Sequence, residues 1–189
     1  LPPAGRYGVG MVFLPRDAEL ADQCRRMVQT LARETGLEFL GWRTVPVVDS
    51  VLGQVARGGQ PRIEQCFIGG GADCDTACLE LRLYILRKRI DHDARELFGA
   101  DVPLYLPSLS ARTLVYKGLV MGAQIASYYS DLDDPLFASA IAVIHQRYST
   151  NTFPSWKLAQ PFRCLAHNGE INTLRGNINQ MHARESRLA

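Results

Sequence analysis

The spacing of apolar and polar residues along the chain predicts a mixture of strands and helices. Residues 7–14 form a short apolar run that Pro15 closes, as expected of a buried strand. Asp17 then precedes apolar residues at helical spacing, which predicts a capped helix reaching about Glu34. A second apolar stripe predicts another long helix at 75–95. Further strands are expected at 37–48, 62–68, 104–109, 113–116, 140–147 and 162–167, and shorter helices at 121–129 and after Thr173.

The order of these elements favours an α+β fold. Strands and helices come in clusters and do not alternate regularly, so antiparallel pairing is expected, with no doubly wound parallel sheet. Ser110 to Arg112 has the length of a hairpin connection between 104–109 and 113–116. The glycines at 69–71 lack the Gly-Lys-Ser/Thr ending of a phosphate-binding loop, so we expect a hinge there.

Composition and charge exclude several classes of function. The chain has 189 residues, of which 47% are hydrophobic and 21% charged, as in a globular domain. A net charge of +2 gives no reason to expect binding to nucleic acid. No apolar run approaches the roughly 20 residues that a transmembrane helix needs, so no membrane partner is expected. The basic run 87–89 is expected on the exposed side of its helix.

The five cysteines do not suggest a disulfide framework or a metal centre. They are scattered along the chain, which favours reduced thiols. Cys74 and Cys78 lie four positions apart, a spacing compatible with metal or redox chemistry. A structural zinc site needs four ligands, however, and no second close pair exists, so ordinary packing is favoured and no metal is expected. The acidic run 131–134 lacks the glycine and distal glutamate of a calcium loop.

The segment 145–177, HQRYSTNTFPSWKLAQPFRCLAHNGEINTLRGN, contains the candidate chemistry. Arg147 ends an apolar strand, where it needs either an internal ion-pair partner or the carboxylate of a ligand. Asn168-Gly169 can be a simple hairpin turn. The same dipeptide can also offer an amide and a backbone N–H to a developing oxyanion, because glycine lets the backbone approach a ligand. The residues alone leave both pairs of alternatives open.

Two motifs, Thr152 to Trp156 and Gly169 to Asn177, resemble the glutaminase domain of glutamate synthase large subunits, and residues 7–15 and 110–118 support the resemblance. That domain is a class II, N-terminal-nucleophile amidotransferase. The resemblance implies a four-layer αββα sandwich with two antiparallel sheets. It also implies that residues 1–189 are a partial domain, incomplete at both ends.

The resemblance assigns roles to four residues. Arg147 would bind the α-carboxylate of glutamine, and Thr150 would line the same pocket. The Asn168 side chain and the Gly169 N–H would hold the oxyanion of the tetrahedral intermediate. The family's nucleophilic cysteine is expected upstream of Leu1, so the chain alone is expected to be inactive. Three nearby residues are expected to be structural only: His145, Cys164 and His167.

The implied reaction is hydrolysis of glutamine to glutamate and ammonia, for reductive transfer to 2-oxoglutarate. The acceptor would be a synthase region of the same polypeptide, which would hold FMN and an iron–sulfur cluster, with no cofactor in this chain. The resemblance also allows a small NADPH-oxidising subunit and a cytoplasmic or plastid location. Two alternatives remain: a non-catalytic module that binds glutamine, and the glutaminase domain of another class II amidotransferase.

Overall fold

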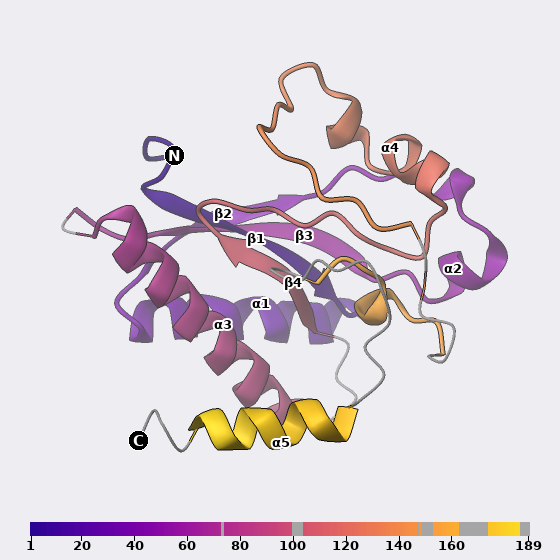
Figure 1. Ribbon diagram of the computed structural model, residues 1–189. Coiled ribbons are helices and arrows are strands. Elements are labelled where there is room, and N and C mark those ends of the chain that lie inside the picture. Colours follow the sequence, from indigo (N-terminus) through magenta and orange to yellow (C-terminus); the bar gives the residue numbers. More distant parts are fainter. Residues whose placement is uncertain (73, 100–103, 147, 149–152, 163–173, 186–189) are drawn as a thin grey trace.

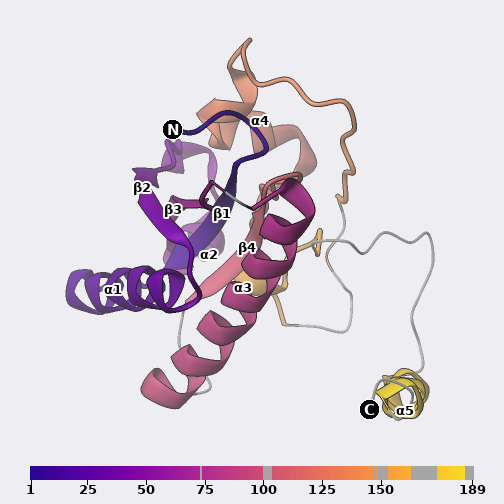
Figure 2. The same cartoon turned by 90° about the vertical axis from the view of Figure 1, so that its left-hand side faces the viewer.

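The fold is built on one antiparallel sheet that is covered on both faces. The computed structural model describes residues 1–72, 74–99, 104–146, 148, 153–162 and 174–185. The four strands lie in the order β2-β3-β1-β4, and helices α1 and α3 cover one face (Figures 1 and 2). The strands are β1 (Tyr7–Leu14), β2 (Glu38–Thr44), β3 (Arg62–Gly69) and β4 (Tyr105–Ser110). The predicted α+β class with antiparallel pairing is therefore confirmed.

The two long helices form where the apolar stripes predict them. Helix α1 (Ala18–Glu34) begins after Asp17, whose carboxylate accepts a hydrogen bond from the Leu20 N–H at 2.8 Å. Helix α3 (Thr76–Phe98) begins after Asp75, which caps the N–H of Cys78 at 2.7 Å. Each cap satisfies a backbone donor that the first helical turn leaves free. The buried stripes of both helices contribute to the larger core cluster with one face of the sheet.

Two glycines in the central strand β1 allow neighbouring side chains to pack closely against it. A Cβ on Gly8 would lie 2.3 Å from Cδ1 of Leu83 on α3. A Cβ on Gly10 would lie 2.5 Å from Sγ of Cys66 on β3. A side chain at either position would therefore require the Leu83 or Cys66 side chain to shift, as expected where glycine allows close packing in a strand.

Smaller elements cover the opposite face of the sheet. They are α2 (Gln54–Gly58), α4 (Ile125–Tyr128) and the 3-10 turns at Asp49–Val51, Gly122–Gln124, Ser130–Asp133 and Trp156–Leu158. A second core lies beneath them and contains Met11, Phe13, Tyr128, Tyr129 and Trp156. The helical character expected at 121–129 is confirmed.

Both outer strands of the sheet are irregular. In β2, the pairing with β3 shifts between Phe39 and Gly41, and Gly41 has a φ of 150°. In β4, the pairing with β1 shifts between Met11 and Phe13, and the strand contains Pro107. Strand β2 also ends at Thr44, earlier than the expected 37–48.

Three expectations about individual segments are wrong. Residues 113–116 are not a strand, because the Ser108 hydroxyl bonds the Val115 N–H at 3.1 Å in place of a regular backbone ladder. Residues 140–146 also form no strand, since no described segment pairs with them. Arg87 is buried and bonds the Asp91 carboxylate at 2.8 Å, so the basic run 87–89 is not wholly exposed.

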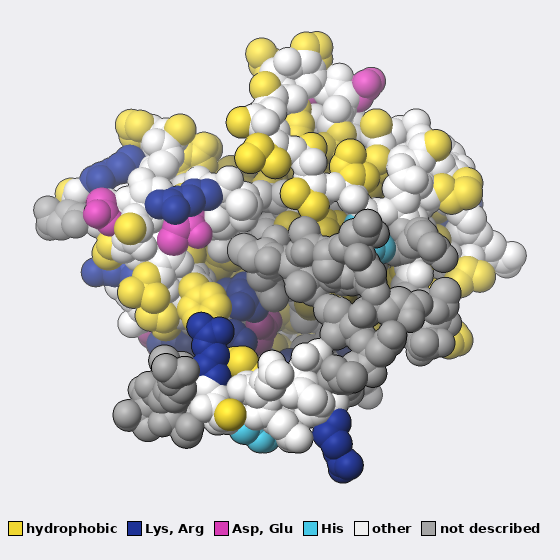
Figure 3. All heavy atoms as spheres, viewed as in Figure 1, with side chains coloured by type: hydrophobic (Ala, Val, Ile, Leu, Met, Phe, Trp, Pro, Cys, Tyr) yellow, Lys and Arg dark blue, Asp and Glu magenta, His cyan; other side chains and the backbone are white. Residues whose placement is uncertain are grey.

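The segment preceding position 147 has apolar side chains at the surface. Ile141, Val143 and Ile144 are 79%, 62% and 76% exposed. Hydrophobic side chains are visible on this upper part of the molecule, where Figure 1 draws the segment in orange (Figure 3).

The helix expected after Thr173 is present as α5 (Leu174–Glu185), and its described side chains from Arg175 onward are all exposed. Within the described part of the chain, no helix has the length and hydrophobicity needed to cross a membrane.

A polar network fastens the 3-10 turn at Ser130–Asp133 to the sheet. Arg43 on β2 donates to both carboxylate oxygens of Asp131, at 2.8 and 2.5 Å. The Tyr116 hydroxyl donates to Asp131 at 2.8 Å and accepts from Gln65 on β3 at 3.2 Å. Hydrogen bonds from Arg43, and then from Tyr116, hold the pKa of Asp131 below its usual value despite its burial.

We predict that Asp131→Asn lowers the free energy of unfolding by about 1–2 kcal/mol at neutral pH, because it removes charge-assisted hydrogen bonds. The wild-type advantage should be complete above the ordinary aspartate pKa of about 3.9. It should disappear as the pH falls through the lower pKa of the folded state. Urea unfolding of both proteins across this pH range measures the difference.

Glu34→Gln is the control, because the Glu34–Arg89 pair is half exposed on both sides and should contribute less than about 0.5 kcal/mol. An Asp131→Asn effect no larger than the control, or one independent of pH, would contradict the role given to this network.

Candidate functional site

A cavity of about 790 Å³ lies next to the sequence motif that contains the candidate residues. Residues 51–56 form one wall and residues 118–121 form another. The remaining lining residues are Gln124, His145, Gln146, Tyr148, Pro154, Ala159 and Gln160. The cavity is large enough for an amino-acid substrate, since small-molecule sites usually measure about 300–1,000 Å³.

The four residues predicted to do the chemistry lie outside the described residues. These are Arg147, Thr150, Asn168 and Gly169. The structure does describe both chain neighbours of Arg147, and Gln146 and Tyr148 both line the cavity. The cavity therefore borders the predicted carboxylate-binding arginine along the chain.

Trp156 joins the two walls of this cavity. Its indole N–H donates to the Ala56 carbonyl at 2.9 Å, which fixes it to the first wall. Its ring also lies against the second wall, where a Cβ on Gly118 would be 2.4 Å from Cζ3. The ring is buried and meets Phe13 edge-on, with centroids 6.0 Å apart. A single rigid side chain thus sets the separation of the walls.

Tyr148 links the arginine motif to the segment that carries Trp156. Its hydroxyl accepts from the Ser155 N–H at 2.9 Å and donates toward the Ser155 carbonyl at 3.2 Å. The residue next to Arg147 is therefore tied to the residue before Trp156. Through this contact, the tryptophan anchor also constrains the backbone beside Arg147.

Lys117 is a buried cation beneath the same region. Its side chain is 1% exposed and donates to the Lys157 carbonyl at 2.9 Å and the Tyr105 hydroxyl at 3.2 Å. The ammonium lies 4.6 Å from the ring centroids of both Tyr105 and Phe162, within the range of cation–π attraction. Lys117 therefore connects β4 to Lys157 within the 3-10 turn of Trp156 and to Phe162 beyond it.

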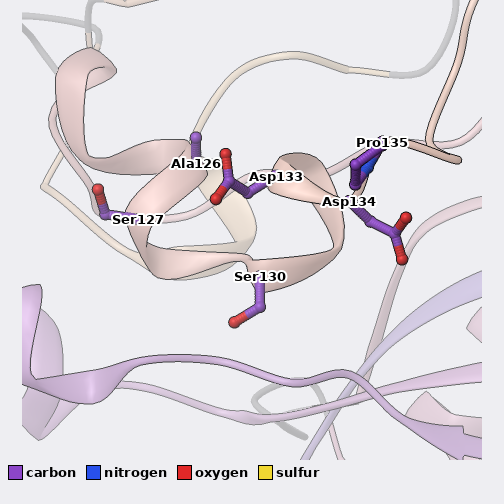
Figure 4. Close-up of a pocket in the computed structure, with 6 residues that line it drawn as sticks. All are labelled: Ala126, Ser127, Ser130, Asp133, Asp134 and Pro135. Carbon is purple, nitrogen blue, oxygen red and sulfur yellow. The ribbon is translucent and has the colours of Figure 1, made fainter.

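A second, shallower cavity of about 440 Å³ lies at the acidic turn. Figure 4 shows that the Ser130, Asp133 and Asp134 side chains point in different directions, so their oxygens do not converge on one point. Asp131 is engaged by Arg43 and Tyr116. No group of three or more metal-binding side chains occurs within the described ranges.

Burial affects the titratable groups near the larger cavity. The Tyr128 ring lies 5.8 Å from Trp156, and burial raises its pKa above the usual value. Burial also raises the pKa of Tyr129, whose hydroxyl donates to the Lys117 carbonyl at 2.7 Å. Both phenols therefore remain neutral and support the site by packing.

Sequence reasoning did not identify Trp156, Tyr148 or Lys117 as supporting residues. Two signals were available: Trp156 ends one quoted motif, and Lys117 lies in the run 110–118. Neither signal shows that Trp156 reaches Ala56, because the two residues are 100 positions apart in the chain.

Comparisons with known proteins agree on one family. The glutamine amidotransferases of class II match the chain over residues 1–189. The NADPH glutamate synthase large chain of Azospirillum brasilense is 45% identical over 98% of this chain and 12% of its own length. The corresponding Bacillus subtilis protein is 46% identical over 100% of this chain, again 12% of its own length. A ferredoxin-dependent glutamate synthase of Synechocystis is 47% identical, with the same two coverages. The chain thus spans about an eighth of these relatives.

We predict that Gly118→Ala lowers the free energy of unfolding by about 1–3 kcal/mol, because the new methyl group overlaps the Trp156 ring. Gly58→Ala in α2 is the matched control, since a Cβ there meets nothing within 4 Å. The control should change stability by less than about 0.5 kcal/mol. Urea unfolding compares them, and equal effects would show that Trp156 does not set the separation of the walls.

Proposed function

Because the chain belongs to the class II glutamine amidotransferases, we propose that it is the glutaminase part of a glutamate synthase large chain. It would hydrolyse the side-chain amide of glutamine to give glutamate and ammonia. The match along the whole chain to proteins named glutamate synthase is the observation that carries this proposal.

Glutamine would bind in the larger cavity through its α-carboxylate. Arg147 would grip the carboxylate with its planar fork, and Thr150 would line the same pocket. The position of this cavity supports the assignment, since Gln146 and Tyr148 on either side of Arg147 line it. Its volume of about 790 Å³ also suits an amino acid.

Amide hydrolysis places negative charge on the carboxamide oxygen when a nucleophile attacks. The Asn168 side-chain amide and the Gly169 N–H would donate to this oxyanion, which would accept both hydrogen bonds more strongly than the substrate carbonyl does. Of the described cysteines, Cys24 and Cys66 are poor candidates for the nucleophile. They are buried in the core, and burial raises the pKa of their thiols to about 11 and about 12.

We also propose a second sheet, as in the four-layer αββα sandwich. Such a sheet would cover the exposed apolar side chains of residues 140–146. One feature supports this: Ile141, Val143 and Ile144 are exposed and do not pack on the first sheet.

The ammonia would pass to a synthase region in the same polypeptide, where 2-oxoglutarate becomes glutamate. The share of 12% that the chain covers in its relatives leaves ample length for such a region. FMN and an iron–sulfur cluster would lie there, and a small NADPH-oxidising subunit is a further proposed partner. The protein would act in the cytoplasm or, in a photosynthetic eukaryote, in the plastid.

We predict that Asn168→Ala in the full-length protein lowers kcat with glutamine by a factor on the order of 10²–10³. The reaction with added ammonia should keep most of its rate, because ammonia bypasses the step in which the oxyanion forms. Steady-state assays with the two nitrogen sources measure both rates. Asn179→Ala on the exposed face of α5 is the control and should change neither.

Equal losses with glutamine and with ammonia would mean that Asn168 supports the fold, and the oxyanion assignment would fail. Full retention of the glutamine rate would instead indicate that a donor pair elsewhere holds the oxyanion. A non-catalytic glutamine-binding module would show no glutamine-dependent rate even in the wild type.

We predict that Arg147→Lys raises KM for glutamine roughly tenfold or more, because lysine keeps the charge but loses the bidentate fork. Thermal unfolding should change little. Arg26→Lys on the exposed side of α1 is the matched control. An unchanged KM together with a lower unfolding temperature would make Arg147 the partner in an internal ion pair.

A further inference from the structure

Cys74 and Cys78 form a thiol pair at the start of α3. Their sulfur atoms lie 2.8 Å apart, within hydrogen-bonding distance. Cys74 precedes the N-cap residue Asp75, and Cys78 is the residue whose N–H the cap binds. The capping hydrogen bond therefore holds the two residues in register before any bond between the sulfurs forms.

The two sulfurs differ in their access to solvent. Cys74 is 3% exposed, and its side chain packs against Gly70, where a Cβ would lie 3.1 Å from the Cys74 Cβ. Cys78 is only partly buried. The hydrogen bond with Cys78, followed by burial, raises the pKa of the Cys74 thiol. Cys78 is thus the sulfur that a small reagent reaches first.

The other described cysteines provide an internal comparison. Cys24 on α1 and Cys66 on β3 are fully buried, and burial raises the pKa of both thiols. Thiol–disulfide exchange requires an accessible thiolate, so neither residue is suited to react in the folded protein.

We propose that Cys74 and Cys78 are a site of reversible oxidation, at which a low-molecular-weight disulfide converts the two thiols into an intramolecular disulfide. The site is separate from the proposed glutaminase chemistry, since neither cysteine lines the larger cavity. It depends only on the geometry at the start of α3.

The exchange takes place in two steps. The Cys78 thiolate attacks one sulfur of the small disulfide, forms a mixed disulfide and releases one small thiolate, which takes up a proton. Cys74 then loses its proton and attacks Sγ of Cys78, which breaks the mixed disulfide and releases the second small thiol. The two protein thiols are oxidised, and one small disulfide is reduced to two thiols.

The first step also prepares the second. The electrostatic effect of Cys78 is one of the factors that raise the pKa of the Cys74 thiol. Once Cys78 is part of a mixed disulfide, its sulfur can no longer ionise, so this electrostatic effect is lost. Deprotonation of Cys74 is then easier, next to a sulfur that is already positioned for attack.

The test uses the folded full-length protein and excess oxidised glutathione. After exposure, the protein is denatured, all free thiols are alkylated, and tryptic peptides are analysed by mass spectrometry. The peptide from Ile63 to Arg82 contains Cys66, Cys74 and Cys78. In the wild type it should carry one alkyl group, on Cys66, and lack two hydrogens. Without oxidant it should carry alkyl groups on all its cysteines.

Two single variants test the order of attack. In Cys74→Ser, Cys78 should accumulate as a stable mixed disulfide with glutathione, because no second thiol can release it. In Cys78→Ser, Cys74 should remain free and become alkylated after denaturation. Circular dichroism of each variant verifies the fold before oxidation.

The proposal is overturned if the wild-type peptide is fully alkylated after excess oxidant. It is equally overturned if both variants gain glutathione to the same extent, since that would remove the distinction between an accessible and a buried sulfur. Subsequent treatment with dithiothreitol should restore full alkylation of the wild-type peptide, and failure to do so would contradict reversibility.

Discussion

The packing of the Trp156 ring against the backbone of Gly118 is the constraint on which the candidate site depends. The ring takes the space of a missing side chain on one wall and donates a hydrogen bond to the other wall at Ala56. Tyr148 then connects the tryptophan segment to the residue beside Arg147. The backbone at Tyr148, next to the predicted carboxylate-binding residue Arg147, is thus constrained by an aromatic ring and a glycine that need not touch substrate.

The elements that were predicted correctly are those whose pattern is local. Helices α1 and α3 have amphipathic stripes and aspartate caps within their own sequence. Strand β1 is a short apolar run closed by Pro15, and β3 lies between Pro61 and the glycines at 69–71. The segment 113–116 has strand-like composition, yet the hydroxyl of Ser108 binds its backbone. Strand formation depends on a distant partner, which composition cannot reveal.

The candidate site shows the same difference between features that are visible in the local sequence and features that depend on distant contacts. The motif with Arg147, Thr150, Asn168 and Gly169 could be found from the sequence through its resemblance to glutaminase domains. The residue types alone left an internal ion pair and a hairpin turn open as alternatives. All four lie outside the described residues, so their roles remain predictions. The supporting roles of Trp156 and Lys117 were not predicted, because each arises from contacts between segments far apart in the chain, Trp156 with Ala56 and Lys117 with Lys157. Arg87 was misjudged for a related reason, since neighbouring charges do not disclose which one faces the core.

The irregular outer strands limit how this sheet can grow. Pro107 has no N–H to offer to a neighbour, and the left-handed backbone at Gly41 interrupts the outer edge of β2. Neither outer edge of the sheet offers an added strand a continuous row of backbone donors and acceptors. The sheet is therefore protected against edge-to-edge association with another molecule.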